Sequence, residues 1–242
     1  MSPQAGTQHP VVLSYLGLRK AIGIIGLALP FVLVFGQTLS QKSWGCCSTA
    51  TSVPRRLGPF LIQESISSYY DSSMRDVLVG SLCAIGVFLL SYKGYDNDKR
   101  DAIAGRLACI FAVGVALFPM DMGIVHYIFA GLLFLTLAYF CLVLFIKTSP
   151  TRNPTRRKIH RNGIYRVCGH TILVCIALIS AVMAVMQVPD LKTELKPFTP
   201  IFWLESLAVF AFGLAWFTKG QAILADERSE TPPNPRADVA WR

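Results

Sequence analysis

The longest uncharged stretch of this chain runs from Met122 to Ile146 and contains no Asp, Glu, Lys or Arg. The hydrocarbon core of a bilayer is about 30 Å thick, and an α-helix needs roughly 20 apolar residues to cross it. This stretch is therefore long enough to span a membrane. Only 15% of the whole chain is charged, whereas soluble domains carry about 25%. The sequence predicts an integral membrane protein.

The distribution of apolar residues predicts an all-α fold, a polytopic membrane helical bundle with six transmembrane helices. We expect these spans at residues 21–38, 77–92, 102–118, 122–146, 167–188 and 200–218. Together they take up about half of the chain, so we expect one membrane domain, residues 21–219. It follows a cytoplasmic N-terminal segment, residues 1–20. The tail, residues 220–242, is rich in Pro and polar residues, which is typical of disorder.

The positions of Lys and Arg predict the orientation. Most of the 23 basic residues lie before the first span and after the second, fourth and sixth spans. Basic loops stay in the cytoplasm, so both termini are expected there. The run from Arg152 to Arg166 is predicted to be a basic loop, which either acts as a stop-transfer signal or contacts anionic lipid head groups. Because topology explains the net charge of +9, we do not expect nucleic-acid binding.

Two ionisable residues lie inside the predicted spans, near their outer ends. His126 and Glu205 each lie about 7 Å below a helix end, at a rise of 1.5 Å per residue. Ionisable residues within a membrane are costly and usually functional. Since the two share one depth, we expect them to be able to hydrogen-bond across the bundle. An alternative is that the pair only ties two helices together.

Further polar residues are expected on the same outer face, mostly in the segment between the first and second spans. The candidate catalytic residues are His126, Ser67, Asp76 and Glu205. The candidate ligand-binding residues are Tyr70, Arg75, Asp121 and Trp203. Arg75 could instead form an interfacial ion pair, and the tyrosines could be an aromatic belt. Cys46 and Cys47 fall in the same outer segment, where the sequence leaves their redox state open.

Several strings resemble a known family. They are Ser65-Ile-Ser-Ser-Tyr-Tyr, Met74-Arg-Asp-Val-Leu-Val-Gly, Gly86-Val-Phe-Leu-Leu-Ser-Tyr-Lys-Gly-Tyr, Ala116-Leu-Phe-Pro and Val125-His-Tyr-Ile-Phe-Ala-Gly. Over residues 15–220 the chain resembles a bacterial family of uncharacterised six-span membrane proteins, distantly similar to DRAM/Sfk-type membrane proteins. The resemblance implies a fold and a bacterial inner membrane but no reaction.

A weaker resemblance is to membrane hydrolases such as the alkaline ceramidases, and it implies a zinc site. Those enzymes hold zinc with three His, two of them four residues apart, and this chain has no His-x-x-x-His. Structural and catalytic zinc sites need three or four protein ligands. We therefore predict no metal, and the sequence leaves any cofactor open.

Three functions remain from the sequence. The first is binding of a membrane lipid or another amphiphile in a polar pocket at the outer face. The second is a lipid hydrolase or acyltransferase in which His126 acts as base for a serine or water, since such catalysis needs a nucleophile, a base and an orienting group. The third is a small transporter or channel. The sequence does not indicate the oligomeric state.

Overall fold

The computed structural model describes residues 10–44, 54–92, 99–147 and 155–223. In this part of the chain, four stretches of helix are long and apolar enough to cross a membrane: Leu16–Gln41, Ile124–Leu144, Arg156–Val185 and Pro200–Lys219. The chain is therefore an integral membrane protein with an all-α body. The predicted tail from residue 224 onward and the residues Cys46 and Cys47 lie outside the described residues.

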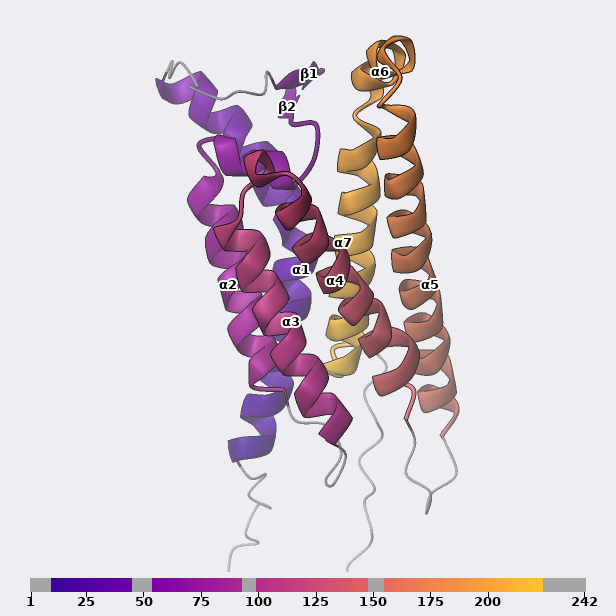
Figure 1. The fold of residues 1–242 in the computed structure, drawn as a ribbon. Coiled ribbons are helices and arrows are strands. Elements are labelled where there is room, and N and C mark those ends of the chain that lie inside the picture. Colours follow the sequence, from indigo (N-terminus) through magenta and orange to yellow (C-terminus); the bar gives the residue numbers. More distant parts are fainter. Residues whose placement is uncertain (1–9, 45–53, 93–98, 148–154, 224–242) are drawn as a thin grey trace, which may run out of the picture.

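The described elements alternate long helices with short connections (Figure 1). In chain order they are α1 (Pro10–Trp44), β1 (Arg55–Leu57), β2 (Phe60–Ile62), η1 (Ser67–Asp71), α2 (Arg75–Leu90), α3 (Lys99–Leu117), η2 (Met120–Met122), α4 (Ile124–Tyr139), η3 (Phe140–Leu144), α5 (Arg156–Val185), α6 (Pro189–Leu195), η4 (Lys196–Phe198) and α7 (Pro200–Lys219). β1 and β2 form a small antiparallel hairpin, and η3 is a π-helical turn that continues α4.

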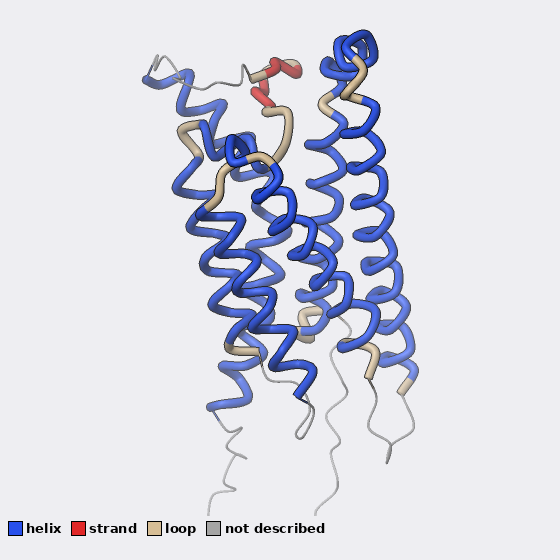
Figure 2. The backbone as a smooth tube through the Cα atoms, viewed as in Figure 1, coloured by secondary structure: helices blue, strands red, loops and turns tan. Residues whose placement is uncertain are grey.

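The long helices form a closed ring. α1 packs on α2, α2 on α3, α3 on α4, α4 on α5, α5 on α7, and α7 returns to α1. The β1–β2 hairpin and α6 lie together at one end, which we call the hairpin end (Figures 1 and 2). α1 begins and α7 finishes at the opposite end, which we call the basic end because Arg19, Lys147 and Lys219 lie there.

Four of the six predicted spans coincide with the stretches that are long and apolar enough to cross a membrane. The other two correspond to α2 and α3, which do not belong to this set. α2 has only 16 residues, and α3 begins with Lys99, Arg100 and Asp101 and carries Arg106. Both helices nevertheless lie beside the longer ones in the ring (Figure 1).

The basic run was predicted to be a loop, and this is wrong for its described part. α5 begins at Arg156, about three turns before the expected start of the fifth span at residue 167. The side chain of Thr155 accepts a hydrogen bond from the backbone N–H of Lys158 and caps this helix. Hydropathy marks where a helix enters lipid and not where it begins, so the basic turns were missed. Residues 152–154 lie outside the described residues.

Glycine allows α1 and α7 to touch along their backbones. A Cβ atom on Gly213 would lie 2.6 Å from the backbone nitrogen of Leu27, and one on Gly23 would lie 2.5 Å from the backbone nitrogen of Phe217. Small residues at such crossings permit close van der Waals packing between membrane helices. This contact joins the first and last helices and closes the ring.

We expect Gly213→Ala to lower the stability of the protein by about 1–3 kcal/mol, because the backbone of α1 cannot move aside as a side chain could. The matched control is Gly80→Ala in α2, where an added Cβ meets nothing within 4 Å. There the better helix propensity of Ala should leave stability unchanged or raise it by up to about 1 kcal/mol. Thermal unfolding of the purified variants in detergent measures both. Equal midpoints for the two variants would show that the α1–α7 contact does not depend on Gly213.

Candidate functional site

A segment of the chain folds over the hairpin end and is fastened to α7. We call residues 63–71 the cap segment. The backbone N–H of Ile66 donates to Oε2 of Glu205 at 2.6 Å, and the backbone of Ser67 also interacts with that carboxylate. The backbone N–H of Phe202 donates to the carbonyl of Glu64 at 3.1 Å. Lys196 forms an ion pair with Glu64 at 3.0 Å. The cap segment is thereby held on the first turns of α7.

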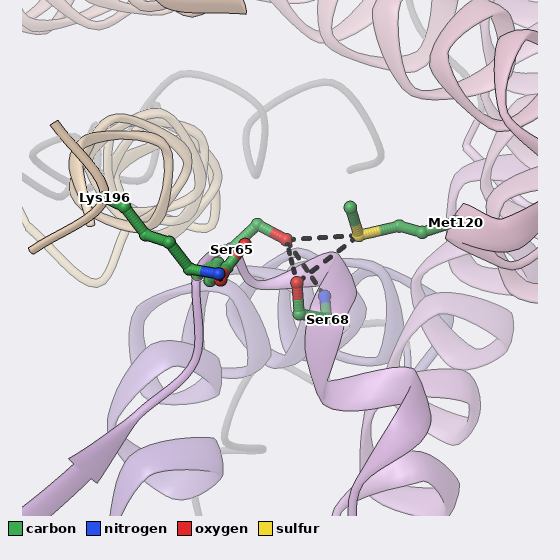
Figure 3. A network of polar contacts seen from close by, with 5 residues as sticks. Ser65, Ser68, Met120 and Lys196 are labelled. Atoms are coloured by element: carbon green, nitrogen blue, oxygen red, sulfur yellow. Dashed lines mark hydrogen bonds and ion pairs between the residues drawn. The ribbon is translucent and has the colours of Figure 1, made fainter. Parts of the chain in front are cut away.

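A serine pair fixes the local shape of the cap segment (Figure 3). Oγ of Ser65 lies 2.7 Å from Oγ of Ser68 and accepts from the backbone N–H of Ser68 at 3.0 Å. Sδ of Met120 lies 3.3 Å from Oγ of Ser65 and 3.4 Å from Oγ of Ser68, so one hydroxyl donates to the other and the second hydroxyl donates to the sulfur. Ser65 thus satisfies an N–H at the start of η1 that has no partner within the helix. Met120 links the cap segment to the turn between α3 and α4.

Tyr69 anchors the cap segment in the protein interior. Its side chain is fully buried, and its ring centroid lies 6.3 Å from that of Phe202. Burial raises the pKa of Tyr69 to about 12, against a smaller opposite effect of the nearby backbone of Gln63. The hydroxyl therefore stays protonated at physiological pH, and no charge is placed in this core.

A cavity of about 780 Å³, a volume that includes its open mouth, lies beneath the cap segment. Its polar wall at the hairpin end is made by Ser67, Tyr70, His126 and Glu205. The remaining lining is apolar and comes from Ile66 of the cap segment and from α1, α2, α3, α4 and α7. On α4 the lining extends from His126 to Leu137, which is about 16 Å along a helix. The cavity is thus polar at one end and apolar along its length.

The ring of His126 has a defined tautomer. Its side chain is buried, and its Nδ1 lies 2.7 Å from the carbonyl oxygen of Phe118. A carbonyl oxygen only accepts hydrogen bonds, so Nδ1 carries the hydrogen. In the neutral ring the other nitrogen, Nε2, is then an acceptor. His126 is fixed by the end of α3 and offers an acceptor to the cavity.

His126 and Glu205 line the same cavity, but among the described residues each bonds to a backbone group and not to the other. The expected hydrogen bond across the bundle is therefore not formed. The sequence correctly predicted that both residues lie near the same end of the bundle, because the depth of a residue follows from its distance along the helix. It did not indicate their partners, because backbone N–H and C=O groups have no signature in the side-chain pattern.

The other candidate residues fall into two groups. Ser67 and Tyr70 line the cavity. Arg75 is exposed; its guanidinium donates to the hydroxyl of Tyr70 at 2.6 Å and lies 4.2 Å from the centroid of that ring. Arg75 therefore positions Tyr70 from outside the cavity. Asp76, Asp121 and Trp203 are exposed and do not line the cavity.

Sequence reasoning missed two features of this site. The Ser65–Ser68 pair has the spacing of a helix cap and could have been found from Ser65-Ile-Ser-Ser. The N–H groups of Ile66 and Ser67, which hold Glu205, carry no such signal. Within the described residues, no group of three or more His, Cys, Asp or Glu side chains could hold a metal ion.

We compared the chain with models of protein families, with curated proteins and with solved structures, and it matches none of them. The resemblance to the six-span family therefore stays a prediction.

We expect Glu205→Ala to loosen the cap segment, because the N–H of Ile66 would lose its side-chain acceptor. A buried donor left without an acceptor costs about 1–3 kcal/mol, so backbone hydrogen exchange in residues 63–71 should become about tenfold faster or more. Glu205→Gln keeps an acceptor oxygen and should show a smaller change. Hydrogen-exchange mass spectrometry of the purified protein measures this.

The control for this experiment is Glu64→Ala. It removes the ion pair with Lys196, whose side chains are 45% and 60% exposed. Exposed ion pairs contribute at most about 1 kcal/mol, so exchange in the cap segment should change little. Equal effects of Glu205→Ala and Glu64→Ala would contradict the anchoring role of Glu205.

Proposed function

We propose that the protein binds a single-chain lipid or similar amphiphile in the cavity beneath the cap segment, with the head group at the hairpin end. One observation carries this proposal: the cavity has its polar groups at one end and apolar side chains along the rest. Ligand pockets are mostly apolar, with a few polar groups that fix orientation. A molecule with a polar head and an apolar chain matches this order.

The polar end favours a head group that donates hydrogen bonds. Nε2 of His126 is an acceptor in the neutral ring, and Glu205 contributes a carboxylate whose Oε2 accepts from the cap segment. Arg75 was a candidate ligand-binding residue, but its guanidinium is engaged with Tyr70 outside the cavity lining. We therefore expect an amine, an amide or several hydroxyls on the bound head group, since an anion would face the Glu205 carboxylate.

A hydrolase or acyltransferase, the alternative function, would use residues of the same polar wall. Ser67 and His126 both line the cavity, as a nucleophile and a base would. Among the described residues, however, no hydrogen bond joins them, and the partner of His126 is a carbonyl instead of a carboxylate. Binding without turnover is the function that these contacts support better.

The proposal includes a topology of six crossings with both termini in the cytoplasm, in a bacterial inner membrane. α2 and α3 lie beside the longer helices in the closed ring. A helix of 16 residues is about 24 Å long, and a short helix is accommodated by local thinning of the bilayer. The positively charged basic end would then face the cytoplasm, and the cavity would open on the outer leaflet.

We expect Leu133→Trp to abolish binding of a fluorescent long-chain alkylamine, because the indole would fill the cavity. Leu133 lines the cavity and is 7% exposed. Its neighbour Leu132 is 38% exposed, so Leu132→Trp is the matched control and should bind as wild type does. Titration of the fluorescent amine into purified protein measures both. Equal binding by the two variants would contradict the cavity as the site.

We expect the wild-type protein to prefer the alkylamine over an alkyl sulfate of equal chain length, measured as displacement of the fluorescent probe. His126→Phe should weaken amine binding by about tenfold, since one hydrogen bond contributes about 1 kcal/mol or more. A preference for the sulfate would refute the assignment of the head group. Release of a fatty acid from a single-chain ester by wild type, but not by His126→Phe, would establish the hydrolase instead.

A further inference from the structure

The cavity beneath the cap segment ends before it reaches the basic end. α2, α4 and α7 each run from the hairpin end toward the basic end (Figure 1). The lining residues farthest along these helices are Ile85, Leu137 and Phe212. The side chains about one turn further on do not line the cavity and are fully buried; they are Leu89, Phe140 and Trp216. The cavity is therefore closed at its deep end.

Four aromatic rings pack against one another beyond this deep end. They are Tyr92, Phe140, Phe145 and Trp216, and we call them the aromatic floor. The ring centroid of Trp216 lies 5.2 Å from that of Tyr92 and 5.0 Å from that of Phe145. The centroid of Phe140 lies 5.5 Å from those of both Trp216 and Tyr92. Rings at such distances are in direct contact, so the aromatic floor is a packed layer.

Phe212 lies between the cavity and the aromatic floor. Its side chain lines the cavity and is 2% exposed, and its ring centroid lies 6.2 Å from that of Trp216. A Cβ atom on Gly26 would lie 3.2 Å from Cδ1 of Phe212, so the ring lies against the backbone of α1. Phe212 thus extends from α7 to α1 at the deep end of the cavity.

The depth of the cavity corresponds to a definite length of alkyl chain. From His126 to Leu137 the lining extends about 16 Å along α4. Carbon–carbon bonds of about 1.5 Å that meet at about 111° advance about 1.25 Å per carbon in an extended chain. With the head group at His126, the cavity is therefore long enough for about 13 carbons.

We propose that the cavity selects its ligand by chain length, with a limit at about 13 carbons, and that Phe212, supported by the aromatic floor, is the residue that sets this limit. This inference rests on the proposed function, the binding of an amphiphile with its head group at the hairpin end. A shorter chain leaves part of the lining without contacts. A longer chain has carbons for which the closed end leaves no room.

The test is a series of primary alkylamines from octylamine to octadecylamine, each used to displace the fluorescent amine from the full-length protein. Affinities refer to the free amine in water, measured by equilibrium dialysis, and Leu133→Trp gives the background. Each methylene that enters the cavity should raise affinity about fourfold. We expect this rise up to dodecylamine or tetradecylamine and no further rise for hexadecylamine and octadecylamine.

Two variants should move this limit in opposite directions. Phe212→Ala should lengthen the accepted chain by about two carbons or more, because the space left by the ring closes only in part. Its matched control is Phe210→Ala on the same helix, since Phe210 is 38% exposed and does not line the cavity. Leu137→Phe should shorten the accepted chain by about two carbons, because the added volume lies at the deep end. Its control is Leu135→Phe, at a position 47% exposed.

The outcomes separate this inference from the proposed function. If no amine of the series binds wild type above the Leu133→Trp background, the proposed function is refuted, and the length limit with it. If amines bind but affinity still rises from tetradecylamine to octadecylamine, only the length limit is refuted. An unchanged limit in both Phe212→Ala and Leu137→Phe refutes the role of this end of the cavity. Should Phe212→Ala fail to fold, Leu137→Phe alone decides, because a shorter limit supports the proposal and an unchanged one overturns it.

Discussion

The carboxylate of Glu205 and the backbone N–H of Ile66 satisfy each other inside the bundle, and the architecture of the hairpin end depends on this contact. A carboxylate at this depth is costly unless donors surround it. The start of η1 supplies such donors, because the first N–H groups of a helix have no partner within it. The cap segment therefore closes over α7 at Glu205, and the cavity beneath it acquires a polar end. Without this contact, the cap segment would keep the backbone hydrogen bond between Phe202 and Glu64, the exposed ion pair of Glu64, the contacts of its two serines with Met120 and the packing of Tyr69.

The closed ring and the cavity follow from different physical causes. Glycines at the α1–α7 crossing bring the two backbones together. The resulting van der Waals contacts stabilise the crossing even in lipid. Toward the hairpin end, the ring of helices encloses the cavity. The side chains that α2, α4 and α7 contribute to its wall there include Leu, Ala and Val. An apolar cavity without a ligand loses those packing contacts. A bound apolar chain would restore them.

Much of the fold could be predicted from the sequence. The long apolar runs, and the depth of His126 and Glu205, follow directly from helix geometry. The partners of these two residues could not be predicted, because each bonds to the backbone of a distant segment. The early start of α5 was missed for a related reason: basic residues are good helix formers, but they interrupt the apolar pattern that marks a span. Arg161 is buried because its helix begins before the apolar run does.

The two ends of the bundle are opposite in their electrostatic character. At the hairpin end, Glu205, His126 and two hydroxyl side chains line a cavity, so this end carries acidic and neutral polar groups. At the basic end, Arg19 and Lys219 lie beside aromatic rings, so this end carries cations. At both ends the folded chain buries side chains that hydropathy alone would place in water. Buried charges are weakly screened by salt, so electrostatic interactions at each end are stronger than those of exposed loops of the same composition.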